Sequence, residues 1–441
     1  MEEKELKTQE FSNDEVHLIV HRRPACRIEF EVKAQPSLVE SAHILAVKSV
    51  AKDVTLPGFR KGRAPSELIL RNFSHQVDKK WQEVIANLAF QECEQIAKIP
   101  PLQKESRVTF KMKSHSLEKG AELTLSFETD PEVPVVDASS IELKKIERPE
   151  VSPEKVNETI RQVQLFFAEW QKIPDRQVQE GDFVLLDVDI IEQDPPQKLF
   201  SNTRFEVTPH SMAKWMRELV LGKSKEDVIE GKSYLDEDAK PEEHKDFQPK
   251  SARITIKDIE QAIPPPLDDH FAQKLGVASL EDLRNSIERL LNTQADAHVQ
   301  GQMREQVNEY LLSHYKFDLP TSMIEKETNF RMRQLLEDSQ FVTYWESMSE
   351  DDRRKTVQQI YAQSEKAVRM FYLCRKLIEQ AQISVEAKDL PQPPKTPLEA
   401  LLRPQTELHF QHESEVKQAE AYSRILMEKA QDYLIANAKI V

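Results

Sequence analysis

The sequence predicts a multidomain α+β protein whose C-terminal part is mostly α-helical. Its 441 residues allow about three domains of typical size. Runs in which apolar and polar residues alternate, as in strands, lie within the first 260 residues, whereas apolar residues at helical spacing dominate from residue 263 onwards. We therefore expect an N-terminal α+β domain, then a second domain that contains strands, and a helical domain last.

Residues 1–130 are expected to form the first, compact α+β domain. The runs 26–32 and 123–127 alternate as strands do, while residues 37–54 and 81–96 carry apolar side chains at helical spacing. The resulting order of strand, helix, loop, helix and strand is typical of a compact α+β domain.

The most distinctive segment is the loop between these helices, which reads Gly58-Phe59-Arg60-Lys61-Gly62-Arg63-Ala64-Pro65. The chain has only 8 glycines, and two of them stand here, where the backbone must turn tightly. One aromatic and three cationic side chains share the loop, which favours contact with an anionic partner. A solvated connection between helices is the alternative that residue types alone leave open.

The net charge of −15 at first argues against a nucleic-acid partner. The charge is uneven, however: residues 1–120 hold 20 Lys+Arg and 17 Asp+Glu, which leaves 41 against 59 for the rest of the chain. Any contact with phosphate is therefore expected in the N-terminal part, while the remaining residues should be repelled from RNA.

The loop resembles the ribosome-docking signature of bacterial trigger factor, a Gly-Phe-Arg-any-Gly-Lys-any-Pro pattern, with Arg63 in place of the usual lysine. The resemblance runs along the whole chain at lower similarity. It implies an ATP-independent chaperone for nascent polypeptides that docks beside the exit tunnel, on a ribosomal protein and nearby ribosomal RNA, and it allows a homodimer off the ribosome. By the same resemblance, the docking residues are Gly58, Phe59, Arg60, Lys61, Gly62, Arg63 and Pro65.

Residues 131–175 are predicted to be a linker that contains a helix. Three prolines mark the junction, and residues 141–146 alternate as an extended strand or linker would. Residues 151–170 follow the helical period, with Ser152 as N-cap and Pro153 at the first helical position.

Residues 176–262 are expected to form a second domain. Residues 183–191 and 252–259 are predicted strands, and a short helix is predicted around Trp215. This order resembles an FK506-binding-protein (FKBP)-type prolyl isomerase, the middle domain of trigger factor, and so implies peptidyl-prolyl cis-trans isomerase activity.

The resemblance also locates a proline pocket, with Phe183, Ala213, Trp215 and Met216 as candidate residues. Such enzymes use an apolar aromatic pocket to stabilise the twisted amide, which lowers a barrier of about 18–20 kcal/mol. Here Met212-Ala213-Lys214-Trp215-Met216 replaces a Met-Ile-Pro-Gly-aromatic stretch, and residues 242–244 stand where a tyrosine is expected. Loss of aromatic walls should weaken activity. The alternative is that Phe183, Phe205, Trp215 and Phe247 are core residues.

Residues 263–441 are predicted to be a helical domain that follows a stiff proline-rich linker at 263–267. Ser279 and Asp282 form a capping-box-like helix start, and residues 315–320 and 391–397 are predicted breaks. The resemblance implies arms that cradle unfolded chain. Several methionines are candidates for adaptable binding patches, with helix-packing core as the alternative. They are Met303, Met323, Met332, Met348 and Met370.

Other features point to a cytoplasmic protein without a cofactor. Three widely spaced cysteines argue against a disulfide framework or zinc site, and no secretory signal or membrane-spanning run is present. His409 and His412 form only a weak metal constellation, and the sequence lacks nucleotide-binding and nucleophile motifs. Two alternative functions stay open: a free FKBP-type isomerase with substrate-recruiting flanking domains, and a non-enzymatic assembly scaffold.

Overall fold

The computed structural model describes residues 8–103, 108–192, 196–236, 247–386, 389–390, 395–402 and 415–441. The chain divides into two compact units, one of residues 1–146, 301–390 and 414–441, the other of residues 147–300 and 391–413. Each unit combines helices with antiparallel strands, which confirms the α+β multidomain class. The finer division at residues 130, 175 and 262 stays a prediction.

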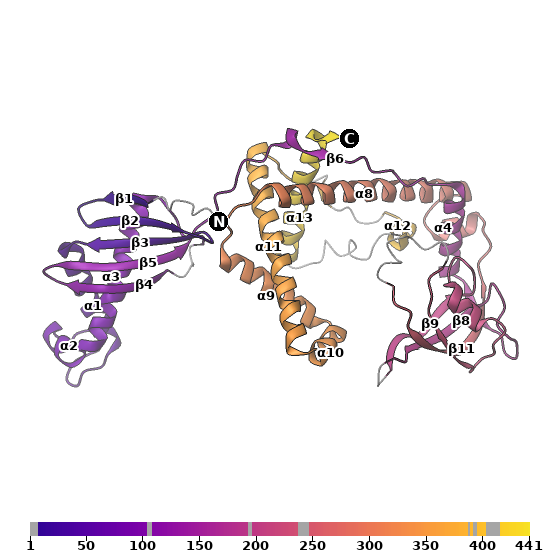
Figure 1. Cartoon of the computed structure of the whole chain (residues 1–441), viewed down its shortest axis with the longest axis horizontal. Helices are drawn as coiled ribbons and strands as arrows, with labels where there is room; N and C mark the ends of the chain where they lie inside the picture. The colour runs from indigo at the N-terminus through magenta and orange to yellow at the C-terminus, as the bar shows by residue number, and fades with distance from the viewer. Residues whose placement is uncertain are drawn as a thin grey trace. The chain divides into compact units, whose positions relative to one another are not determined.

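The first unit begins with a five-stranded antiparallel sheet in the order β1-β2-β3-β5-β4 (Figure 1). Alternate residues of the central strands are buried, and helices α1 (Pro36–Asp53) and α3 (Ser74–Ala97) pack on that buried face. Both predicted strands and both predicted helices are confirmed, whereas β1, β2 and β4 were not predicted. The strands are β1 (Thr8–Ser12), β2 (Val16–Arg23), β3 (Arg27–Ala34), β4 (Thr109–Ser116) and β5 (Gly120–Glu128).

The rest of the first unit is mostly helical. Helix α8 (Leu280–His314) ends at the predicted break, and α9 (Thr321–Glu337) begins directly after it. The guanidinium of Arg304 on α8 binds both carboxylate oxygens of Asp432 on α13 at 2.7 Å. The C-terminal strand β12 pairs in parallel with β6, which confirms an extended segment within residues 141–146. The other elements are η1 (Ala138–Ser140), β6 (Glu142–Leu143), α10 (Ser339–Ser347), α11 (Glu350–Ala381), α13 (Glu415–Asn437) and β12 (Lys439–Ile440).

The second unit contains another antiparallel sheet, in the order β10-β11-β8-β9, with β7 also paired to β11. The predicted strands near residues 183 and 252 and the short helix at Trp215 are confirmed. Its strands are β7 (Glu169–Lys172), β8 (Phe183–Ile190), β9 (Gln197–Glu206), β10 (Val228–Lys232) and β11 (Ser251–Ile263). Its helices are α4 (Pro153–Phe166), α5 (Lys214–Val220), α7 (Asp269–Lys274), the first half of α8, and α12 (Pro397–Leu402).

One predicted helix is too long. Helix α4 starts as predicted, with the Ser152 hydroxyl accepting from the N–H of Lys155, but it ends at Phe166. Trp170 lies in β7 and pairs with Ala262 of β11. Pairing with a strand about ninety residues away therefore overrides the local helical pattern.

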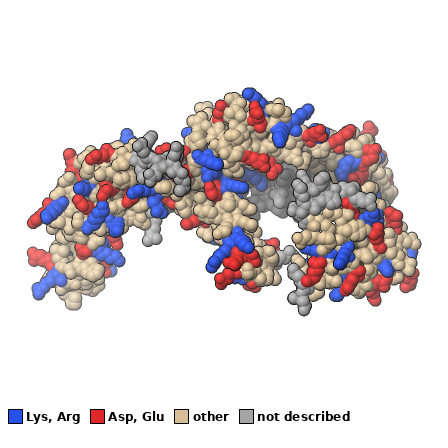
Figure 2. Space-filling view, in the orientation of Figure 1, with Lys and Arg blue, Asp and Glu red and all other residues tan. Residues whose placement is uncertain are grey.

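Some predictions fall outside the described part of the chain, namely those on residues 242–244, on the prolines at 391–394, and on His409 and His412. Figure 2 shows Lys and Arg side chains intermingled with Asp and Glu over the visible face, as expected for a chain with 31% charged residues.

Candidate functional site

The predicted docking loop lies between α1 and α2 (Ser66–Asn72), and a tight turn opens it. The N–H of Phe59 donates to the carbonyl of Leu56 at 3.1 Å. Pro57 and Gly58 hold the two central positions, and Gly58 has a φ of +88°. Proline followed by a residue with positive φ is the signature of a type II turn, for which glycine is strongly preferred at the second position.

A second turn follows at once and ties the loop to α1. The N–H of Arg63 donates to the carbonyl of Arg60 at 2.9 Å, and Gly62 between them has a φ of +80°. The N–H of Gly62 also donates to the carbonyl of Ala51, at 3.0 Å, in the last turn of α1. Two successive turns with one such tether hold the loop in a defined shape.

A small apolar cluster beneath the loop completes its support. Leu56, just before the predicted docking loop, and Ala64, near its end, are half-buried and pack on this cluster, while Phe59 is not among its members. The buried members come from α1, α2 and α3, and they are Val47, Val50, Ala51, Ile69 and Val77. The loop is therefore anchored at both ends, and its central side chains are left for other contacts.

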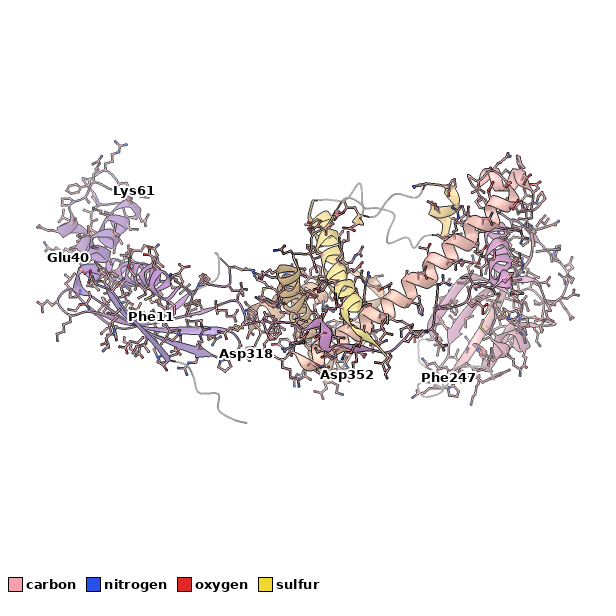
Figure 3. The ribbon with its side chains drawn as sticks, turned by 90° about the horizontal axis from the view of Figure 1, so that it is seen from above. Phe11, Glu40, Lys61, Phe247, Asp318 and Asp352 are labelled. Carbon is pink, nitrogen blue, oxygen red and sulfur yellow. The ribbon has the colours of Figure 1, made fainter. Side chains whose placement is uncertain are left out.

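Those central side chains face solvent. Phe59 is 40% exposed, and Arg60, Lys61 and Arg63 are all exposed. Among the described residues, none of these three cations forms an ion pair, whereas Lys113 on the nearby sheet binds Glu31 at 2.6 Å. Figure 3 shows Lys61 at one end of the N-terminal part. An exposed aromatic ring beside unpaired cations suits a contact surface better than an internal role.

The candidate proline-pocket residues do not all come together. Met216 is buried and Trp215 half-buried in a cluster that includes Val184 of β8, and exposed Ala213 precedes their helix, α5. Phe183 precedes Val184 in the strand, so its side chain points to the opposite face of the sheet. The structure therefore brings Trp215 and Met216 into one cluster, with exposed Ala213 just before them in the chain, and leaves Phe183 apart.

The surroundings of Phe183 are structural in character. Its ring meets that of Trp170 edge to face, with centroids 4.9 Å apart. The guanidinium of Arg204 lies 3.8 Å from the Trp170 ring centre and binds Glu260 at 2.7 Å. Stacking and ion pairing fix this face of the sheet, which favours the core alternative for Phe183. Of the other three possible core aromatics, Phe205 and Trp215 pack on the α5 cluster, and Phe247 is half-buried.

A third candidate surface is an apolar groove in the first unit, with a volume of about 460 Å³. Helices α9, α11 and α13 contribute Phe330, Phe371 and Met427 to its lining, and Phe330 and Phe371 are 47% and 42% exposed. Met323 also lines the groove, whereas Met303 and Met370 are buried in the helix packing. A flexible thioether beside exposed aromatic rings suits varied apolar partners.

Comparison with known proteins identifies the family. A model described as "Bacterial trigger factor protein (TF)" matches residues 17–163, and a model of the C-terminus of the same protein matches residues 279–436. The chain belongs to the bacterial trigger factor family. The two matches enclose residues 164–278, which contain the second sheet.

Relatives named trigger factor cover most of this chain. The protein of Protochlamydia amoebophila is 28% identical over 396 residues, 89% of this chain and 88% of its own length. That of Chlamydia abortus is 25% identical over 387 residues, 86% of each chain. A solved structure titled "Promiscuous Substrate Recognition in Folding and Assembly Activities of the Trigger Factor Chaperone" aligns over 98% of this chain and 99% of its own, with 17% identity and a TM-score of 0.48.

Two cations beside the predicted docking loop are not among the site residues that the sequence analysis predicts. Lys48 and Lys52 on α1 are exposed and, within the described ranges, form no ion pair. The signal was available, because two lysines four residues apart on a predicted helix share one face, and the loop follows ten residues after the first.

The cysteines of this trigger factor family chain offer no nucleophile. Burial raises the pKa of each of the Cys26, Cys93 and Cys374 thiols to about 12, and Asp318 adds to the shift at Cys26. A thiol with a raised pKa stays protonated at neutral pH and reacts slowly. In the described part of the chain, no three His, Cys, Asp or Glu side chains cluster as metal ligands would. Over the same part, no helix is both long and apolar enough to span a bilayer.

Proposed function

We propose that this protein is an ATP-independent chaperone that acts in the cytoplasm, docks on the ribosome and shields nascent polypeptides. The observation that carries the proposal is the loop at residues 58–65, where Phe59 is 40% exposed beside three unpaired cations. Aromatic and arginine side chains are the residue types that dominate binding energy at interfaces. Family membership supports the same partner, because the loop lies within the matched residues 17–163 and resembles the family's ribosome-docking signature, with Arg63 in place of the usual lysine.

The test is co-sedimentation of the full chain with ribosomes. The triple variant Phe59→Ala, Arg60→Ala, Lys61→Ala should bind at least about tenfold more weakly, since a single interface anchor contributes about 2 kcal/mol or more. The matched control is Phe110→Ala, Lys111→Ala, Lys33→Ala, which removes one exposed aromatic ring and two lysines from the sheet of the same part. Equal pelleting of both variants and the wild type would reject docking through the loop.

Shielding of clients is assigned to the groove between α9, α11 and α13. An unfolded chain presents apolar side chains, and their burial contributes about 25 cal/mol per Å². The half-exposed rings of Phe330 and Phe371 supply area for this contact without a charge requirement. Binding of this kind needs no nucleotide, which agrees with an ATP-independent cycle.

Prolyl isomerase activity is proposed as a weak second activity of the second sheet and α5. Trp215 is the aromatic ring that α5 offers, and it lies beside the apolar cluster that contains Met216. Among the described residues, Trp215 and Phe205 are the aromatic rings packed on this cluster, and such a site should hold an X-Pro segment less firmly than a pocket lined by more rings. A free isomerase and an assembly scaffold, the two alternatives, are outcomes of the same experiments, because neither requires ribosome binding.

A further inference from the structure

The face of α1 that leads to the docking loop carries two lysines. Lys48 and Lys52 are both exposed. Residues four apart in a helix lie on one face, about 6 Å apart along the axis. Lys52 reaches the loop itself, because a Cβ atom added to Gly62 would lie 3.6 Å from its Cγ. The lysine row and the loop therefore form one continuous surface, which we call the basic ridge (Lys48, Lys52, Arg60, Lys61 and Arg63).

The basic ridge is strongly cationic in an acidic protein. Residues 41–65 contain five Lys+Arg and a single Asp, a balance of +4, although the whole chain carries −15. The one acid, Asp53, follows Lys52 directly, and successive helix residues differ in direction by about 100°. Asp53 is thus turned away from the row that the two lysines form.

The cations of the basic ridge also lack internal partners. Among the residues that the structure describes, none of the five forms an ion pair or a side-chain hydrogen bond. Lysines on the sheet of the same part behave differently, since Lys33 binds Glu122 at 3.4 Å and Lys113 binds Glu31 at 2.6 Å. Unpaired charge that is concentrated in one place favours an external anion.

We propose that Lys48 and Lys52 bind neighbouring phosphates of an RNA backbone beside the docking loop. This inference rests on the proposed ribosome docking and assigns the chemistry of one part of the contact. Two arguments favour RNA over an acidic protein. A polynucleotide carries one charge per nucleotide, so two lysines one helical turn apart can each meet a separate phosphate. Lysine acts as a point charge suited to single phosphates, whereas paired carboxylates favour the fork of arginine.

The proposal predicts a change in salt dependence. Each phosphate contact contributes about 0.7–0.9 to the slope of log affinity against log salt, because binding releases counterions. The double variant Lys48→Gln, Lys52→Gln should therefore lower the slope for ribosome binding by about 1.4–1.8. The full-length labelled protein is titrated with ribosomes at a series of potassium chloride concentrations. The loss of affinity should be largest at low salt and shrink as salt rises.

Two control variants test whether the change in slope is specific to the charges of Lys48 and Lys52. Lys33→Gln with Lys113→Gln makes the same change in net charge in the same part of the chain, but at lysines that already bind carboxylates. It should leave the slope within about 0.3 of wild type, since it removes no phosphate contact. Lys48→Arg with Lys52→Arg keeps both charges and should retain the slope.

A footprint on the RNA identifies the partner. Hydroxyl-radical cleavage of ribosomal RNA in the complex should show a protected stretch that becomes exposed with Lys48→Gln, Lys52→Gln and stays protected with the control pair. A normal slope and an unchanged footprint in the Lys48, Lys52 variant would overturn the inference. A reduced slope with no RNA protection would also overturn it, in favour of an acidic protein surface.

Different results are expected if the docking proposal itself is wrong. If Phe59→Ala, Arg60→Ala, Lys61→Ala pellets like wild type, ribosome docking through the loop is wrong, and this inference falls with it. If that triple variant no longer pellets with ribosomes, but Lys48→Gln, Lys52→Gln has the wild-type salt slope and RNA footprint, docking through the loop stands. Only the proposed contact between α1 and RNA is then wrong.

Discussion

Arg304 and Lys52 are both cations on long helices, yet their surroundings give them opposite roles. Arg304 is only 26% exposed and meets Asp432 at 2.7 Å and Glu428 at 3.2 Å, so its charge is satisfied within the molecule. Lys52 meets no carboxylate among the residues described. Residue type therefore identifies neither a docking residue nor a structural residue here, and the distinction lies in the partners of each side chain.

Arg304 leads to a prediction about stability. Arg304→Ala should destabilise the attachment of α13 to α8 by about 1–2 kcal/mol, because a partly buried bidentate pair is lost and Asp432 is left without it. Arg304→Lys should recover only part of this, since lysine cannot form the paired contact. Hydrogen exchange of residues 424–437 measures the effect. Arg424→Ala is the control, because Arg424 is 63% exposed and lies 3.9 Å from Glu428, and equal exchange in both alanine variants would contradict the prediction.

At the scale of elements, the sequence predicts what local chemistry determines. The start of α8 is an example: the hydroxyl of Ser279 accepts from the N–H of Asp282 at 3.2 Å, as its capping pattern predicts. The same hydroxyl also donates to the Asp282 carboxylate at 2.8 Å. The docking loop is another, because prolines and glycines determine both turns within ten residues. Such signals need no knowledge of the rest of the fold.

Elements that depend on distant partners are not predictable in this way. Trp170 has the spacing of a helix residue, but pairing with Ala262 places it in a strand. Phe183 and Val184 must face opposite sides of their strand, yet the sequence does not tell which side α5 covers. The candidate pocket therefore included Phe183, which lies on the other face of the sheet from Trp215 and Met216. The turns of the loop follow from its own residues, and its role in docking stays a prediction.

The second sheet and α5 lead to a prediction about isomerase activity. The full chain should catalyse cis–trans isomerisation of a short X-Pro peptide weakly, and Trp215→Ala should reduce the rate at least about fivefold, because the ring on α5 is lost. Trp215→Phe should retain most of the rate, which separates the loss of an aromatic wall from a folding defect. Leu199→Ala on β9, at a side chain that is 51% exposed, is the control. Equal rates in Trp215→Ala and Leu199→Ala would place any activity elsewhere, and an inactive wild type would reject the enzyme proposal.

At the scale of the whole molecule, charge distinguishes the two proposed binding surfaces. Residues 1–120 carry a balance of +3 and the remaining residues −18, so attraction to phosphate is confined to one part of the chain. The groove proposed to bind clients is lined mainly by apolar side chains instead, among them Phe330 and Phe371. One surface should thus respond to salt, and the other to the apolar content of its partner.

The two surfaces should therefore be separable by substitution. Phe330→Ser with Phe371→Ser should weaken binding of a permanently unfolded protein by about tenfold or more, because burial of one such ring contributes about 1.5–3 kcal/mol. Ribosome pelleting should stay unchanged, since neither residue belongs to the docking loop. Tyr344→Ser with Val357→Ser is the matched control, at side chains that are 61% and 40% exposed outside the lining of the groove.

Fluorescence anisotropy of the labelled unfolded protein measures its affinity for each variant. The triple variant Phe59→Ala, Arg60→Ala, Lys61→Ala should show the reverse pattern, with wild-type affinity for the unfolded protein and loss of ribosome pelleting. Equal loss of both activities in either variant would mean that client binding and docking share one surface, contrary to the groove and the loop as assigned here.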